Sequence, residues 1–165
     1  MASNHQSKLS PTEKAHHTAT WARTMTKWLV GFGNKTGARW NVVDFGGRTG
    51  SESRGIVDLM AIRKNHSEAS PGLKRGDLFE VVLIQTKGGG AARPNKEEVK
   101  RLTKVGKVYA AKVVLAVWKK AKQLKLFQLK GKGWEHVDAV ELFGQRSAKK
   151  IAMFRLNVKT ISPSP

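Results

Sequence analysis

The sequence contains no cysteine, which excludes disulfide-bonded scaffolds and Cys-ligated zinc or iron–sulfur sites. It also lacks any apolar run approaching the roughly 20 residues that span a membrane, and residues 1–8 lack the apolar core of a secretory signal. Acidic residues are scarce: 12 Asp and Glu stand against 31 Lys and Arg, a net charge of +19. We therefore expect a cytoplasmic protein that binds a polyanion, with nucleic acid ahead of an anionic membrane surface.

The length of 165 residues suits one domain with a sizeable core, and 39% hydrophobic residues is an ordinary globular fraction. We predict a flexible tail at 1–9, a single domain at 10–144 and a basic extension at 145–165. Half of the acidic residues lie in 41–92, whereas 93–132 is strongly basic. Such a basic shell around a local acidic cluster suits a metal-dependent nuclease, because the shell neutralises phosphates and the carboxylates hold a divalent cation. The alternative is a solvated basic surface with acids scattered by chance.

The apolar pattern predicts an α/β domain with one mixed β-sheet flanked by helices. The segment Ser10-Pro11-Thr12-Glu13 is a capping box, and a helix is expected from 11 to about 30, where glycines follow. Its buried stripe is expected to include Ala19, Ala22 and Leu29. The other expected elements are strands at 40–45, 56–62, 78–87, 113–118 and 123–129, helices at 95–111 and 137–143, and one further strand at 151–158.

Two short segments, 55–58 and 85–87, carry the residues that indicate chemistry. Alternation on a strand places Gln85 and Lys87 on one face, about 6–7 Å apart, and Asp58 lies on an earlier strand that is expected beside them. Asp58 and Gln85 supply oxygen ligands for Mg²⁺ or Mn²⁺, with the Thr86 carbonyl as a further ligand. Lys87 can stabilise an attacking hydroxide or the charge that builds on a phosphate. The set predicts a phosphodiester hydrolysis site.

The arrangement resembles the PD-(D/E)XK, or restriction-endonuclease-like, nuclease superfamily over about residues 11–130. The first aspartate of the family maps onto Asp58, preceded here by Val57 in place of the common proline. The (D/E)-x-K strand maps onto Gln85-Thr86-Lys87, a Gln-x-Lys variant that Mrr-type restriction enzymes share. The resemblance implies an α-β-β-β-α-β core, a Mg²⁺- or Mn²⁺-dependent endonuclease activity on DNA, and Asp58, Gln85 and Lys87 as catalytic residues.

Glutamine at position 85 departs from the family pattern, because its neutral oxygen binds a hard cation more weakly than a carboxylate does. Glu52, in the turn before Asp58, is the preferred supplementary ligand, and Asp44 on the partner strand is another candidate. Glu13 corresponds to the acid that many family members carry on the first helix, although its place in the capping box gives it a structural role instead. Without a site, Asp58 would pair with an arginine such as Arg54 or Arg63, and Lys87 would be a solvated strand end.

Nucleic-acid contacts are expected from basic residues along 93–132 and near the site. Gly88-Gly89-Gly90 either lets a phosphate backbone approach or breaks the strand. Of the five tryptophans, Trp40 and Trp118 are expected in the core, and Trp134 is expected to be the most exposed. The predicted nucleic-acid-binding residues are Arg54, Arg93, Lys96, Lys100, Lys119, Lys120, Lys122, Lys130 and Lys132.

The sequence therefore predicts a metal-dependent nuclease acting on DNA, with RNA as a possible substrate and no membrane partner. A chain this short has no separate reading domain, so structure-selective cutting, or specificity supplied by a partner, is expected, and a homodimer is possible. One alternative is a non-catalytic nucleic-acid-binding module on a degenerate nuclease fold. Another is an interaction subunit whose basic surface meets an acidic protein.

Overall fold

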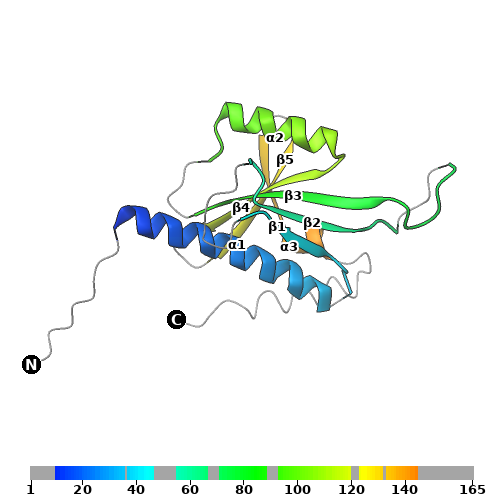
Figure 1. Cartoon of the computed structure of the whole chain (residues 1–165), viewed down its shortest axis with the longest axis horizontal. Coiled ribbons are helices and arrows are strands. Elements are labelled where there is room, and N and C mark those ends of the chain that lie inside the picture. Colours follow the sequence, from blue (N-terminus) through cyan, green and yellow to red (C-terminus); the bar gives the residue numbers. More distant parts are fainter. Residues whose placement is uncertain are drawn as a thin grey trace, which may run out of the picture.

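The computed structural model describes residues 10–35, 37–46, 55–66, 71–88, 93–119, 123–131 and 133–144. All of them fall within the predicted domain at 10–144, and the expected strand at 151–158 lies outside the described residues. The elements, shown in Figure 1, are α1 (Pro11–Lys35), β1 (Asn41–Asp44), β2 (Leu59–Lys64), β3 (Phe79–Lys87), α2 (Lys96–Val108), β4 (Lys112–Lys119), β5 (Gln123–Lys130), β6 (Gly133–Val137) and α3 (Ala139–Phe143).

The strands form one six-stranded sheet in the order β1-β2-β3-β4-β5-β6. Neighbouring strands run antiparallel except β3 and β4, which are parallel and are joined through α2. A parallel pair needs such a crossover connection, because a short turn can join only antiparallel strands. The predicted fold class, an α/β domain with one mixed sheet flanked by helices in the order α-β-β-β-α-β, is confirmed.

The helices lie on both faces of the sheet, with α1 and α3 on one and α2 on the other (Figure 1). The main core lies on the α1 face, where Ile84 and Val114 of the central strands pack with Val30 and Phe143. The indole nitrogen of buried Trp40 donates to the Phe143 carbonyl at 3.1 Å and fastens α3 to the start of β1. None of the described helices combines the length and apolar character needed to cross a membrane.

Two details predicted for α1 are wrong. Helix α1 continues to Lys35 instead of ending near 30, because Gly33 is buried on its packed side and is accommodated inside the helix. Its buried residues include Ala22, Thr26 and Val30, whereas Ala19 is exposed, so the buried stripe is rotated from the predicted one.

Strand β6 was not predicted, and Trp134 within it is half-buried rather than exposed. Strand β6 is short, and its residue pattern alone does not indicate a strand. It is defined by its pairing with β5, where Trp134 lies opposite Leu129. Helix α3 consequently begins later than predicted, after Asp138, whose side chain accepts from the Val140 N–H at 3.0 Å.

Candidate active site

The carboxyl-terminal end of β3 projects beyond its neighbour β2. Regular pairing between the two strands ends at Leu59 and Ile84, while on the other side β3 stays paired with β4 as far as Lys87 and Val117. The three residues that carry the predicted motif, 85–87, therefore lie at a partly open sheet edge. Polar side chains can reach this edge from both faces of the sheet.

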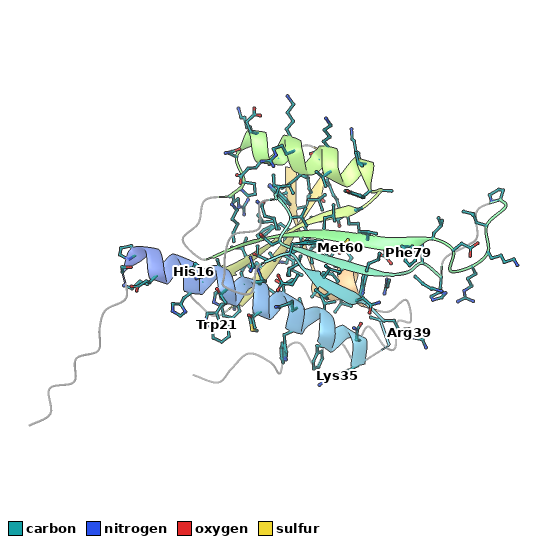
Figure 2. The ribbon with its side chains drawn as sticks, viewed as in Figure 1. His16, Trp21, Lys35, Arg39, Met60 and Phe79 are labelled. Atoms are coloured by element: carbon teal, nitrogen blue, oxygen red, sulfur yellow. The ribbon has the colours of Figure 1, made fainter. Side chains whose placement is uncertain are left out.

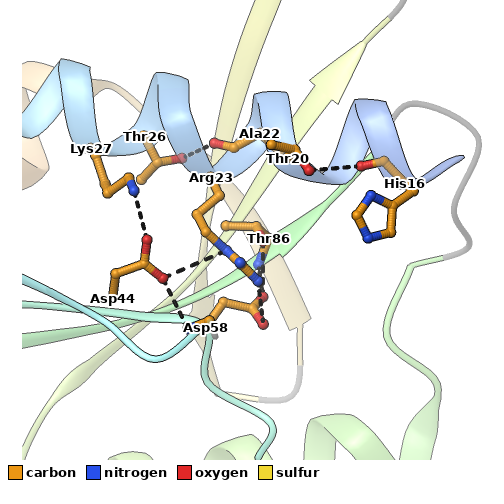
Figure 3. A network of polar contacts seen from close by, with 10 residues as sticks. His16, Thr20, Ala22, Arg23, Thr26, Lys27, Asp44, Asp58 and Thr86 are labelled. Carbon is orange, nitrogen blue, oxygen red and sulfur yellow. Dashed lines mark hydrogen bonds and ion pairs between the residues drawn. The ribbon is translucent and has the colours of Figure 1, made fainter. Parts of the chain in front are cut away.

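Asp58 lies just before β2 and turns its carboxylate onto this edge. Its Oδ2 accepts two hydrogen bonds from Thr86, from the main-chain N–H at 2.6 Å and from the hydroxyl at 2.9 Å (Figure 3). Its Oδ1 lies 4.0 Å from Nη2 of Arg23 on α1. The first predicted motif residue is thus fixed against the middle residue of the second motif, with its other oxygen directed towards a cation.

Gln85 and Lys87 lie together on the α2 face, as predicted, because both contact Glu98. Lys87 Nζ is 3.5 Å from Glu98 Oε1, and the Gln85 side chain donates to the same carboxylate. That bond fixes the amide with its nitrogen towards Glu98. The opposite atom, Gln85 Oε1, is buried and has no hydrogen-bond partner in the part of the chain that the structure describes.

An unsatisfied buried oxygen is costly, and natural proteins keep few of them. Among the described residues, three buried side-chain polar atoms lack a hydrogen-bond partner, and two of them, Gln85 Oε1 and Arg23 Nε, belong to this end of the molecule. The orphaned oxygen of Gln85 is the donor type that a hard divalent cation accepts. The orphaned oxygen of Gln85 therefore fits a metal ligand. Asp58 Oδ1 lies 4.0 Å from Arg23 Nη2, and among the described residues no contact joins Asp58 to Gln85.

Glu98 is a site residue that sequence reasoning missed. The sequence assigned it to the capping box of α2, which the structure confirms: its side chain accepts from the Asn95 N–H at 2.8 Å, and Asn95 accepts from the Glu98 N–H at 2.9 Å. The bond from the Asn95 backbone, with the Lys87 ammonium beside it, holds the pKa of Glu98 below its ordinary value. The ionised carboxylate keeps Lys87 and Gln85 in place.

Arg23 was also missed, and it connects α1 to the site. Its Nε lies 3.8 Å from Asp44 Oδ1, and Lys27, one turn along the helix, contacts Asp44 Oδ2 at 2.6 Å (Figure 3). Burial raises the pKa of Asp44. The hydrogen bonds from Lys27 and Gly46 and the charges of Lys27 and Arg23 lower this pKa by more, so it lies below its ordinary value and the carboxyl stays ionised. A Cβ at Gly46 would overlap the Arg23 guanidinium, so a larger residue there would require this flexible side chain to move.

The arginine expected for Asp58 in the absence of a site was Arg54 or Arg63. Arg63 pairs instead with Glu80 at 2.8 Å, so Arg63 was wrong, and Arg54 lies outside the described residues. The spacing of Arg23 and Lys27 in the sequence could have identified Arg23 as a site residue. This spacing places the two cations together on the side of α1 next to its buried stripe.

Neither Glu13 nor Glu52 is shown at the site as a supplementary ligand. The carboxylate of Glu13 accepts from the Ser10 N–H at 2.7 Å, which confirms the capping box and lowers the pKa of Glu13. Glu52, the preferred supplement, lies outside the described residues. Within the described ranges, no group of three or more His, Asp or Glu side chains is placed to hold a metal ion, so the predicted set depends on amide and main-chain oxygens beside Asp58.

The basic surface follows α2. We call Lys96, Lys100, Lys104 and Lys107 the basic ridge; they are exposed and recur at helical spacing. Arg93 lies over the Phe127 ring at 4.8 Å, and Lys130 pairs with Glu135 at 3.3 Å. The predicted contacts outside the described residues, or without a described side chain, are Arg54, Lys119, Lys120, Lys122 and Lys132.

Comparisons with known proteins find a structural similarity but no family. No protein-family model matches the chain, and no curated protein is significantly similar to it. A solved structure of a Holliday junction resolvase, Hjc of Archaeoglobus fulgidus, is similar at 13% sequence identity and a TM-score of 0.38. The match covers 82% of this chain and 98% of that one. At this level of similarity, function has to be inferred from the residues of the site itself.

Proposed function

We propose that this protein is a metal-dependent nuclease that hydrolyses phosphodiester bonds in DNA. The observation that carries the proposal is the buried, unpartnered Oε1 of Gln85, two residues before Lys87 and next to the residue that binds Asp58. In a purely structural strand end, this oxygen would be satisfied or replaced by an apolar group. A cation ligand is the role that explains its burial.

Three groups would hold Mg²⁺ or Mn²⁺: Asp58 Oδ1, Gln85 Oε1 and the Thr86 carbonyl. The N–H of Thr86 points towards Asp58, and in a strand the carbonyl of the same residue points to the same side. When bound, the metal would lower the pKa of a water molecule and neutralise charge on the phosphate. The hydrogen bonds from Thr86 fix Asp58 Oδ2, while Oδ1 lies 4.0 Å from Arg23 Nη2 and would exchange this contact for the metal.

Lys87 would act on the reacting phosphate. In the structure, its ammonium is positioned by the ionised Glu98 at 3.5 Å, a separation at which the ion pair is loose and Nζ can turn towards a phosphate oxygen. The basic ridge on α2 lies on the same face of the sheet and would neutralise the DNA backbone beside the site. We further propose that cutting depends on DNA structure or on a partner that supplies specificity.

Cleavage of a DNA panel tests this function. The panel contains duplex, single-strand, flap and four-way-junction substrates, each with Mg²⁺, Mn²⁺ or EDTA. We expect metal-dependent cutting that falls at least about 100-fold in Asp58→Asn and in Lys87→Ala, because each removes a group that acts in the transition state. Asp77→Asn and Lys74→Ala are matched controls, since both residues lie on an exposed loop away from the site, and they should cut like the wild type.

A second candidate function is a nucleic-acid-binding module without catalysis, which the neutral Gln85 and the guanidinium of Arg23 beside Asp58 favour. It predicts metal-independent binding and no cleavage on any substrate. Cutting that survives in both site variants contradicts the assignment of the site.

A further inference from the structure

The outer side of α1 carries a stripe of exposed residues at seven-residue spacing. Lys14, Trp21, Trp28 and Lys35 follow one another every two turns, with His17, Thr24 and Gly31 between them, and all seven are exposed. We call this set the α1 stripe. Figure 2 shows Trp21 and Lys35 on the outer side of the helix. Trp21 is 52% exposed and Trp28 is 44% exposed, which is unusual for such large side chains.

The aromatic rings of the α1 stripe are held by neighbouring rings. Trp21 stacks on Trp118 of β4, with the centroids 6.2 Å apart and the planes 18° apart. Trp28 contacts Phe32 at 5.8 Å, and the Lys35 ammonium lies 5.5 Å from the Phe32 centroid. The two indoles are therefore pre-ordered, so that a ligand stacking on them has less side-chain motion to restrict.

The charge of the α1 stripe is of one sign. Its two lysines flank the tryptophans, and the only acid of α1, Glu13, is engaged at the helix cap. Aromatic rings with flanking cations and no acid are the chemistry that binds unpaired nucleotides, because bases stack on the rings and phosphates meet the cations. Two turns of helix separate the tryptophans by about 10.5 Å along the helix axis, a distance that a flexible single strand can bridge with a base on each ring.

We infer that the α1 stripe is a binding surface for single-stranded nucleic acid, with Trp21 and Trp28 as base-stacking platforms. A second copy of the chain is disfavoured as occupant, since it would bring another surface of a +19 protein against these lysines. The inference deepens the proposed function, on which it rests, by naming unpaired nucleotides as part of the substrate.

Binding measured in EDTA tests the inference separately from cleavage. The probes are fluorescein-labelled oligo(dT), an abasic oligomer of the same length and a duplex, followed by anisotropy with the full chain. We expect the wild type to bind oligo(dT) more tightly than the abasic oligomer. Trp28→Ala should weaken oligo(dT) binding roughly tenfold, as expected for one stacked base, and leave the abasic oligomer and the duplex unchanged. Trp28→Phe should restore most of the loss, because it keeps a ring.

Tyr109→Ala is the matched control, because Tyr109 is 64% exposed at the far end of α2. It should bind oligo(dT) like the wild type. Equal oligo(dT) affinity of Trp28→Ala and the wild type overturns the inference. So does a wild-type dimer in sedimentation that Trp28→Ala dissociates without a change in oligo(dT) affinity, because the stripe would then be an interface between copies. If oligo(dT) binding depends on Trp28 but no substrate is cut, the proposed nuclease function fails while the binding surface stands.

Discussion

The two ends of β3 carry polar residues under opposite conditions. At the first end, Glu80 is satisfied: Oε1 accepts from Lys112 at 3.0 Å and Oε2 from Arg63 at 2.8 Å, while the Arg63 guanidinium lies 4.2 Å from the centre of the Trp40 ring. At the other end, the buried Oε1 of Gln85 has no partner in the described part of the chain. Strand β3 thus has a fully paired ion network near its first residue and an unpaired buried oxygen near its last.

This difference teaches where a function should be sought. The Glu80 network has a structural role, because its charges are paired and its hydrogen bonds are made. The Gln85 end does not, since burial of an unpaired amide oxygen destabilises the fold. Substitutions at the two ends should therefore affect stability unequally, and only those at the Gln85 end should change metal binding.

The largest effect is expected at the satisfied end. Glu80→Gln should lower the free energy of unfolding by about 2 kcal/mol, because it leaves Arg63 and Lys112 without a counter-charge. At the other end, Gln85→Met without metal should change stability by less than about 1 kcal/mol, since the lost bond to Glu98 is offset by removal of the orphaned oxygen. Urea unfolding in EDTA measures both. Equal losses of unfolding free energy in Glu80→Gln and Gln85→Met would contradict the difference between the two ends of β3.

A smaller effect, on metal binding, should appear only at the other end. Gln85→Glu should lower the Mg²⁺ concentration needed for half-saturation about tenfold, equivalent to about 1.4 kcal/mol, because a carboxylate binds a hard cation more strongly than an amide does. Isothermal titration calorimetry with Mg²⁺ measures this change. Gln128→Glu, on half-buried β5, is the control and should leave Mg²⁺ binding as it is. Weaker Mg²⁺ binding in Gln85→Glu would count against this position as a ligand.

The smallest effect is a pH dependence of stability at Glu80. Burial raises the pKa of this carboxyl, but the hydrogen bonds and charges of Lys112 and Arg63 lower it more, so it lies below the ordinary value of 4.5. The folded state therefore binds fewer protons than the unfolded state. The stabilisation is complete above the unfolded pKa and is lost as the pH falls through the folded one. Between pH 7 and acid, the wild type should lose more unfolding free energy than Glu80→Gln, as thermal unfolding across this range would show.

Much of the fold was predictable from local pattern. The apolar run Val81–Ile84 indicated a buried central strand, and the capping boxes at Ser10 and Asn95 located two helix starts because their hydrogen bonds are local. The end of α1 was not predictable, because burial of Gly33 against other elements keeps the helix going. Strand β6 depends on pairing with β5, which no local propensity encodes.

The candidate site divides in the same way. The same-face placement of Gln85 and Lys87 followed from strand alternation and is confirmed by their shared contact with Glu98. The approach of Arg23 to Asp58 was not predictable, because it joins a helix to a residue 35 positions later, just before β2, through tertiary packing alone. The metal and catalytic roles of the three motif residues stay predictions.

Glu98 has a further consequence because it serves two structures at once. The same carboxylate accepts the Asn95 N–H that caps α2 and contacts Lys87. A phosphate that draws Lys87 away would leave Glu98 with the cap and the Gln85 amide, and a change at the cap would in turn release Lys87. The stability of the first turn of α2 should therefore change when a phosphate binds Lys87. Hydrogen exchange at the amides of Glu98 and Val99 should record what binds at the end of β3 without any label placed in the site.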